Sequence, residues 1–307
     1  MPPHWSLLRQ KLVPEPSLIL KKVQVKLPPL PDVALKANQM LQDPDTEINK
    51  IAEVVEKDGA LTTEILRFVN STAMGVRNKV STVKRAVSML GRAGTRTLIL
   101  TTAVNKAATS IKSPHIINRH YSLAGIERGA FAGIVAKRLG IDSDLSYAAA
   151  LLQDFMLPTL TAEFTSEYAE ALESLNKEGG ELVKHEMQFL GTNHARLAAE
   201  QMLEWKFPDD LICCVWLHHE IGKVLTDLEL SESSALPVML SACLPGLIHQ
   251  TPNGTQVLQK LGQKQSIYSL EDVSNELSEQ MSECGLDLSG YQTLSSALEE
   301  LMTTTAH

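Results

Sequence analysis

The sequence has no uninterrupted apolar run long enough to cross a membrane. A transmembrane helix needs about 18 or more apolar residues, whereas the most apolar stretch, Leu236 to Ile248, is interrupted by Pro237 and Pro245. The first 22 residues contain prolines and charges where a signal peptide requires a continuous apolar segment. We therefore expect no membrane association and a cytoplasmic location.

Cysteines and basic residues are also scarce. The chain has four cysteines, of which Cys213 and Cys214 are adjacent, and none belongs to a CxxC pair. This pattern predicts buried thiols rather than a disulfide framework. Lysine and arginine total 28 against 36 aspartates and glutamates, which gives a net charge of −8. Nucleic-acid binding requires a basic surface that releases counterions, so we expect no nucleic-acid partner.

The glycine motifs that mark nucleotide sites and serine hydrolases are missing. Neither GxxxxGK[ST] nor GxGxxG occurs, and no GxSxG elbow is present. We therefore expect no cofactor and no catalytic serine triad.

Apolar residues recur with helical spacing along nearly the whole chain, and strand-like alternation is hard to find, which predicts an all-α fold. A proline-rich linker near the start and Pro114 divide the pattern. The part after residue 225 is expected to pack as an appendage, and the two middle blocks are expected to pack on each other. The four expected parts are an N-terminal segment and linker (1–25), a block of five short helices (26–112), a second helical block (113–225) and a helical extension (226–307).

Two helices have clear end signals. A Ser81 cap opens a helix that Gly91 closes. A later segment, 122–139, is rich in glycine and alanine and is followed by Gly140. Small side chains let neighbouring helices approach closely, so we expect this segment to be a central, buried helix.

Histidines are the most informative polar residues. His218 and His219 are adjacent at the end of an apolar helix, His194 begins the preceding helix, and Asp154 lies near the end of an earlier one. Imidazoles and a carboxylate at helix ends can form a metal site between helices. The alternative is that one histidine of the pair is a core residue while its neighbour is solvated.

Several motifs, taken in order, resemble the bacterial HDOD domain, the HD-related output domain. The resemblance covers roughly residues 26 to 220 and implies a helical module related to the HD phosphohydrolases, including the HD-GYP cyclic-dinucleotide phosphodiesterases. The motifs that carry it are LPPLP at 27–31, KDGALT at 57–62, LRFVNS at 66–71, AVSMLG at 86–91, AAALLQD at 148–154, NHA at 193–195, WKFP at 205–208 and LHH at 217–219.

The resemblance also implies that the HD ligand set has decayed. Gln153 replaces the histidine of the His-Asp pair, Ala124 stands at the position of the first ligand histidine, with His120 one turn earlier, and the closing aspartate falls near Cys243. Only Asp154 of the four remains. Because a neutral amide is a poor substitute for imidazole, we expect no catalytic residue and no bound metal. If an ion is retained, its expected ligands are Asp154, His194, His218 and His219.

These features predict a non-catalytic regulatory module of bacterial signal transduction, acting through signalling proteins or a small phosphorylated ligand. The candidate residues of the degenerate cleft are Gln153, Asp154, His194, His218 and His219. The alternative is a metal-dependent phosphohydrolase or phosphodiesterase that uses the remaining histidines and Asp154. A third hypothesis gives residues 226–307 a role in assembly.

Overall fold

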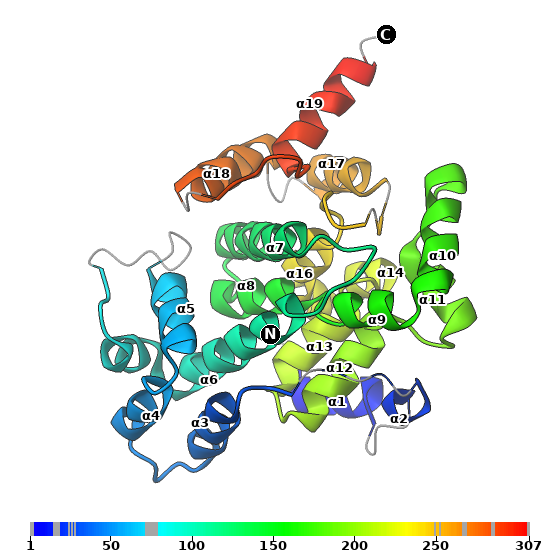
Figure 1. The fold of residues 1–307 in the computed structure, drawn as a ribbon. Helices are drawn as coiled ribbons and strands as arrows, with labels where there is room; N and C mark the ends of the chain where they lie inside the picture. The colour runs from blue at the N-terminus through cyan, green and yellow to red at the C-terminus, as the bar shows by residue number, and fades with distance from the viewer. Residues whose placement is uncertain are drawn as a thin grey trace. The chain divides into compact units, whose positions relative to one another are not determined.

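The protein is helical throughout the part that the structure describes. The computed structural model describes residues 3–14, 19–23, 25, 27, 29–70, 79–248, 250–251, 253–265, 269–283 and 286–305. Within these ranges there is no β-strand (Figure 1), which confirms the predicted all-α class. None of the described helices is both long enough and apolar enough to span a membrane.

The chain divides into two compact units. The smaller unit contains residues 27–110, and the larger contains residues 1–26 together with residues 111–307. The four-part division expected from the sequence remains a prediction.

The described part of the smaller unit consists of helices, one of which has a kink. Its helices are α3 (Asp32–Gln42), α4 (Ile48–Val55), α5 (Gly59–Val69) and α6 (Val83–Thr109). Gly91 interrupts α6 with φ 65° and ψ −172°, which places a break where the sequence predicted a helix end. The cap is Thr82 instead of Ser81, because the Thr82 side chain accepts the hydrogen bond from the Arg85 N–H.

One arginine after the kink organises the end of α3. The guanidinium of Arg92 donates to the carbonyl oxygens of Met40 (3.2 Å), Leu41 (3.0 Å) and Thr46 (2.5 Å), and also to that of Asp43. The last carbonyls of a helix have no partner within the helix. Arg92 therefore provides hydrogen-bond donors for the last carbonyl oxygens of α3 and holds the turn that leads into α4.

Replacing Arg92 with lysine is expected to lower the free energy of unfolding of the smaller unit by about 1–2 kcal/mol, because an ammonium cannot reach this spread of acceptors. Denaturant titration followed by hydrogen exchange in peptides from 27–110 would measure the loss. Arg85→Lys is the matched control, because Arg85 is exposed on the same helix. Equal stability of the two variants would contradict the expectation.

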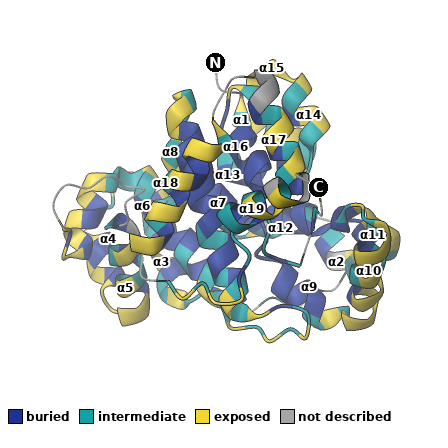
Figure 2. Cartoon of the chain, turned by 90° about the horizontal axis from the view of Figure 1, so that it is seen from above, coloured by how far each residue is buried: buried dark blue, intermediate teal, exposed yellow. Residues whose placement is uncertain are grey.

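The larger unit is built around α7. Buried residues are concentrated on α7, α12 and α13 (Figure 2). The helices of this unit are α1 (Trp5–Leu12), α2 (Ile19–Val23), α7 (Asn118–Leu139), α8 (Ser143–Leu152), α9 (Leu157–Glu163), α10 (Thr165–Glu178), α11 (Leu182–Phe189), α12 (His194–Glu204), α13 (Asp209–Leu217), α14 (Ile221–Thr226), α15 (Leu228–Ser231), α16 (Ala235–Ser241), α17 (Gly254–Gln265), α18 (Leu270–Glu283) and α19 (Leu294–Thr305).

The predicted central helix is confirmed. A Cβ atom on Gly125 would lie 3.1 Å from a Leu151 methyl carbon, and one on Gly129 would lie 3.2 Å from the Tyr147 ring. These glycines let α7 and α8 pack in close contact. The helix ends at Gly140, whose left-handed conformation (φ 69°) suits glycine.

The region after residue 225 is only partly peripheral. Every residue of α16 is buried, so this helix belongs to the core of the larger unit and is not an appendage. Farther along, Glu127 of α7, which is 1% exposed, accepts hydrogen bonds from the Tyr291 hydroxyl (2.7 Å) and the Leu294 N–H (2.8 Å). Burial raises the pKa of Glu127 to about 7.

This buried carboxyl predicts a pH dependence of stability. Because the pKa of Glu127 is higher in the folded protein, its contribution to stability is full below about pH 4.5 and is lost as the pH rises to about 7. We expect the unfolding free energy of the wild type to fall by about 3 kcal/mol relative to Glu127→Gln across this window. Denaturant titrations of both proteins at pH 5.0 and 7.5 would measure the difference, and parallel pH profiles would contradict it.

Candidate metal centre

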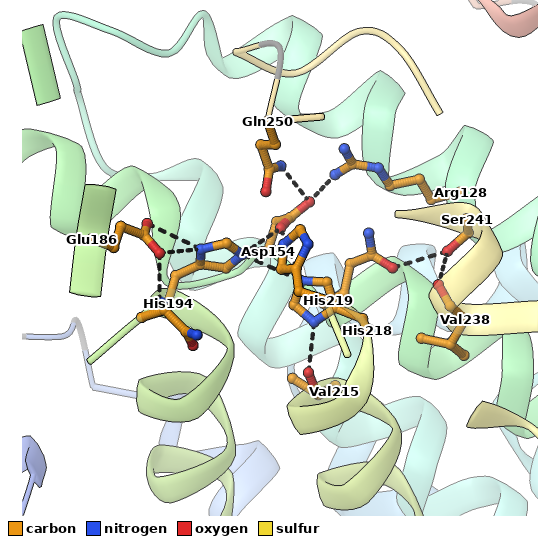
Figure 3. Close-up of polar contacts among 12 residues, drawn as sticks. Arg128, Asp154, Glu186, His194, Val215, His218, His219, Val238, Ser241 and Gln250 are labelled. Carbon is orange, nitrogen blue, oxygen red and sulfur yellow. Dashed lines mark hydrogen bonds and ion pairs between the residues drawn. The ribbon is translucent and has the colours of Figure 1, made fainter. Parts of the chain in front are cut away.

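Asp154 and three histidines converge within the larger unit (Figure 3). Asp154 lies in the turn between α8 and α9, His194 begins α12, and His218 and His219 follow the end of α13. One ligand atom from each residue lies within 4.8 Å of those of the others. His194 and His218 are fully buried, and Asp154 is 4% exposed.

The ligand atoms lie close enough together to share one ion. The Nε2 atom of His194 lies 3.2 Å from that of His218, 3.1 Å from that of His219 and 3.2 Å from Asp154 Oδ1. Asp154 Oδ1 lies 3.6 Å from His218 Nε2. An ion with bonds of about 2.0–2.1 Å in tetrahedral geometry separates its ligands by about 3.3 Å. Four of the six separations are therefore close to this value, and all six are within 4.8 Å.

Hydrogen bonds to the outer nitrogens orient two of the imidazoles. His194 Nδ1 lies 2.8 and 3.0 Å from the two carboxylate oxygens of Glu186, and His218 Nδ1 lies 2.6 Å from the Val215 carbonyl oxygen. Because a carboxylate and a carbonyl accept hydrogen bonds, each Nδ1 carries the proton and each Nε2 presents a lone pair to the cluster.

Glu186 is itself fixed in place. Its side chain is fully buried and accepts hydrogen bonds from the Tyr168 hydroxyl (2.6 Å) and the backbone N–H of His194 (3.0 Å). This carboxylate supports His194 in the way that outer residues support ligand histidines in metal sites.

Electrostatics keep the pair of histidines neutral. Burial lowers the pKa of His218 and His219 well below the usual value, and repulsion from neighbouring histidines lowers it further. Neutral imidazole is the form that binds metal. Asp154 Oδ1 is buried and accepts no hydrogen bond. The lone pairs of His194 Nε2, His218 Nε2 and Asp154 Oδ1 thus face one another, and this donor set fits a transition-metal ion.

The other oxygen of Asp154 has protein partners. Asp154 Oδ2 forms an ion pair with Arg128 of α7 and accepts a hydrogen bond from Gln250 Nε2 (3.1 Å). The Arg128 side chain is 2% exposed. The protein thus supplies one fixed positive charge on this side of Asp154 and leaves Oδ1 for an ion.

Four of the five predicted site residues come together, and Gln153 has another role. The Gln153 side chain is buried, and its Oε1 accepts a hydrogen bond from the Ser241 hydroxyl (2.9 Å) of α16. His219 does not turn away into solvent, because its Nε2 contacts His194. His218 is a buried histidine, as in the alternative, whereas His219 is partly exposed but has its Nε2 atom beside His194.

Sequence reasoning missed Arg128, Glu186 and Gln250. The signal for the first two was a charged residue on the apolar side of a helix: Arg128 lies among small residues, and Glu186 follows the apolar pair Leu182 and Val183. Charges in such positions are rarely buried without a partner. Gln250 lies in a loop, where no pattern distinguishes it.

Comparisons with known sequences identify a family and a relative. Residues 27–221 match the profile of the HDOD domain. An uncharacterised protein of Treponema pallidum (strain Nichols) is 25% identical over 203 residues, which cover 64% of this chain and 38% of that protein. The chain thus spans about two fifths of that relative.

Solved structures share the fold. An HDOD domain protein of unknown function from Geobacter sulfurreducens has a TM-score of 0.58 at 18% identity, over 98% of this chain and 94% of its own. A Shewanella amazonensis protein, named provisionally as a phosphohydrolase, has a TM-score of 0.60 at 20% identity, over 92% and 93%. A Marinobacter aquaeolei protein, named provisionally for signal transduction, has a TM-score of 0.58 at 20% identity, over 92% and 64%.

Proposed function

The chain belongs to the HDOD domain family, and from this premise we propose that it is a signal-transduction module without catalytic activity. In this proposal one divalent transition-metal ion binds Asp154, His194, His218 and His219, and the module acts through protein partners. The name of the Marinobacter relative supports a signalling role. The ion supplies rigidity and local positive charge.

The observation that carries the proposal is the number of ligands. Structural zinc sites are four-coordinate and closed, whereas catalytic sites use three protein ligands and keep a position open for water or substrate. Here three imidazoles and one carboxylate oxygen supply four ligand atoms. A tetrahedral ion bound by all four has no open position for a nucleophilic water.

The surroundings of Asp154 oppose two-metal hydrolysis as well. Two-metal phosphohydrolases bind ions about 3.5–4 Å apart, and a carboxylate that bridges them uses both oxygens. Asp154 Oδ2 is already paired with Arg128 and Gln250. The Gln153 oxygen faces Ser241, so the residue beside Asp154 adds no ligand for a second ion.

A phosphohydrolase is the second candidate, favoured by the partial exposure of His219. If water displaced this imidazole, the ion would gain an open position and a bound nucleophile. The provisional name of the Shewanella relative agrees with this alternative.

Metal content and hydrolysis, measured on one preparation, separate the two candidates. Elemental mass spectrometry of untagged protein purified without chelators is expected to find about one ion per chain. The loaded protein is then assayed with nitrophenyl phosphate, bis-nitrophenyl phosphate and cyclic dinucleotides, and we expect no turnover above that of Asp154→Asn. Turnover that disappears in Asp154→Asn would overturn the non-catalytic proposal, and a protein without metal would overturn the ion site.

A further inference from the structure

A segment near the C-terminus, residues 287–294, is held against α7 at several points. Arg119 Nη1 donates to the Asp287 carbonyl oxygen (3.1 Å), the Asp287 carboxylate (2.6 Å) and the Ser289 hydroxyl (3.1 Å). Its Nη2 donates to the Ser289 carbonyl oxygen. The rings of His120 and Tyr291 meet edge to face at 5.8 Å. We call residues 287–294 the latch segment.

Tyr291 is the residue of the latch segment that enters the core. It is 7% exposed and lies against Gly246, where an added Cβ would be only 2.6 Å from the Tyr291 hydroxyl oxygen. Its hydroxyl donates to Glu127, which also accepts the Leu294 N–H. The absence of a side chain at Gly246 therefore makes room for a buried contact between the latch segment and α7.

The next residue of α7 connects this contact to the metal centre. Arg128 forms an ion pair with Asp154, and the charge of Glu127 opposes the lowering of the Arg128 pKa by burial. Two consecutive residues of one helix thus contact the latch segment on one side and an ion ligand on the other. Because Arg128 is buried, these charges interact with little screening by water.

We propose that ion occupancy of the Asp154 cluster and docking of the latch segment are coupled through Arg128, so that the ion regulates exposure of the C-terminal region. This inference rests on the ion site proposed above. A divalent cation beside Asp154 increases the positive potential around Arg128 and stabilises the Glu127 carboxylate. Hydrogen bonds from Tyr291 and Leu294 to a carboxylate are stronger than those to a neutral acid.

The coupling acts in both directions. If the ion strengthens docking of the latch segment, then docking must strengthen ion binding by the same factor. Loss of the ion releases Tyr291, and a partner that captures the released segment lowers the affinity for the ion. A change in ion concentration then changes the exposure of the latch segment, and binding of a partner changes the affinity for the ion.

Hydrogen exchange of the full chain tests the first direction. Peptides that cover residues 286–305 are compared with and without saturating Zn²⁺, and we expect the ion to slow their exchange about fivefold. Peptides from 27–110 serve as the internal control and are expected to remain unchanged. In Asp154→Asn, which lacks an ion ligand, the added ion is expected to have no effect.

Metal affinity tests the second direction. Competition with a chromophoric chelator is expected to show about a fivefold weaker Zn²⁺ affinity in Tyr291→Phe and a decrease also in Gly246→Ala, which displaces the Tyr291 ring. Arg138→Ala removes an exposed ion pair between α7 and Glu276 of α18 and is expected to leave the affinity unchanged.

The outcomes distinguish the two proposals. A wild-type protein that binds no Zn²⁺ would overturn both the ion site and the coupling. A wild type that binds Zn²⁺ while exchange at 286–305 and the Tyr291→Phe affinity stay unchanged would overturn the coupling alone. Equal losses of affinity in Tyr291→Phe and Arg138→Ala would also contradict a route through Arg128.

Discussion

Replacing Arg128 with methionine is expected to lower the free energy of unfolding by about 3–5 kcal/mol, because it leaves the charge of Asp154 buried without its ion-pair partner. The Arg128 side chain is 2% exposed and that of Asp154 is 5% exposed, so water cannot substitute for the lost guanidinium. Methionine fills much of the same volume, which limits the contribution of a cavity. Denaturant titration of the metal-free protein would measure the loss.

The matched control for Arg128 lies on the same helix. Arg138 forms an ion pair with Glu276 at 2.8 Å, but both side chains are about a third exposed. Exposed pairs contribute about 0–1 kcal/mol, so Arg138→Met is expected to change stability little. Saturating Zn²⁺ is expected to restore part of the stability of Arg128→Met, since a bound ion supplies the missing positive charge. If Arg128→Met and Arg138→Met lost similar amounts of unfolding free energy, Arg128 would not be the residue that compensates the buried charge of Asp154.

Replacing His194 with alanine is expected to weaken Zn²⁺ binding at least about 100-fold, and Glu186→Gln about 10- to 100-fold. His194 contacts every other ligand in the cluster, and Glu186 fixes its tautomer through Nδ1. A glutamine amide at this position could place its nitrogen against Nδ1 and favour the wrong tautomer. Isothermal titration calorimetry and the visible spectrum of the Co²⁺-substituted protein would measure affinity and coordination geometry together.

His185→Ala controls for the loss of a histidine near the site. His185 is adjacent to Glu186 on α11 but is partly exposed and does not belong to the cluster. The Zn²⁺ affinity of His185→Ala is expected to match that of the wild type. If His185→Ala and His194→Ala bound Zn²⁺ equally well, the measured ion would be elsewhere on the protein.

Local patterns predicted much of the helical framework. The small-residue segment before Gly140 is the buried helix α7, and Gly91 marks a break, because glycine readily adopts the positive φ required at both positions. The Ser81 cap was off by one residue, since Ser and Thr are both good caps and only the geometry selects Thr82. Burial of α16 depends on tertiary packing, which the spacing of apolar residues does not determine.

The residues of the cluster were predictable because they lie at helix ends within recognisable motifs. Asp154, His194, His218 and His219 are all at the cluster, while Gln153 is turned toward Ser241. The groups that define the chemistry of the cluster were not predictable in the same way. Arg128 and Tyr291 reach their partners only after distant segments have packed. Glu186 lies eight residues before His194, but only the packing of α11 on α12 shows that the two side chains meet.

The burial of three of the four side chains in the cluster affects how fast a bound ion would be exchanged. Three of them are at most 4% exposed, and His194 is held by Glu186 on its outer side. We expect an ion bound there to leave when the start of α12 or the end of α13 opens locally. The rate of this local opening would then limit how fast the proposed ion signal can change.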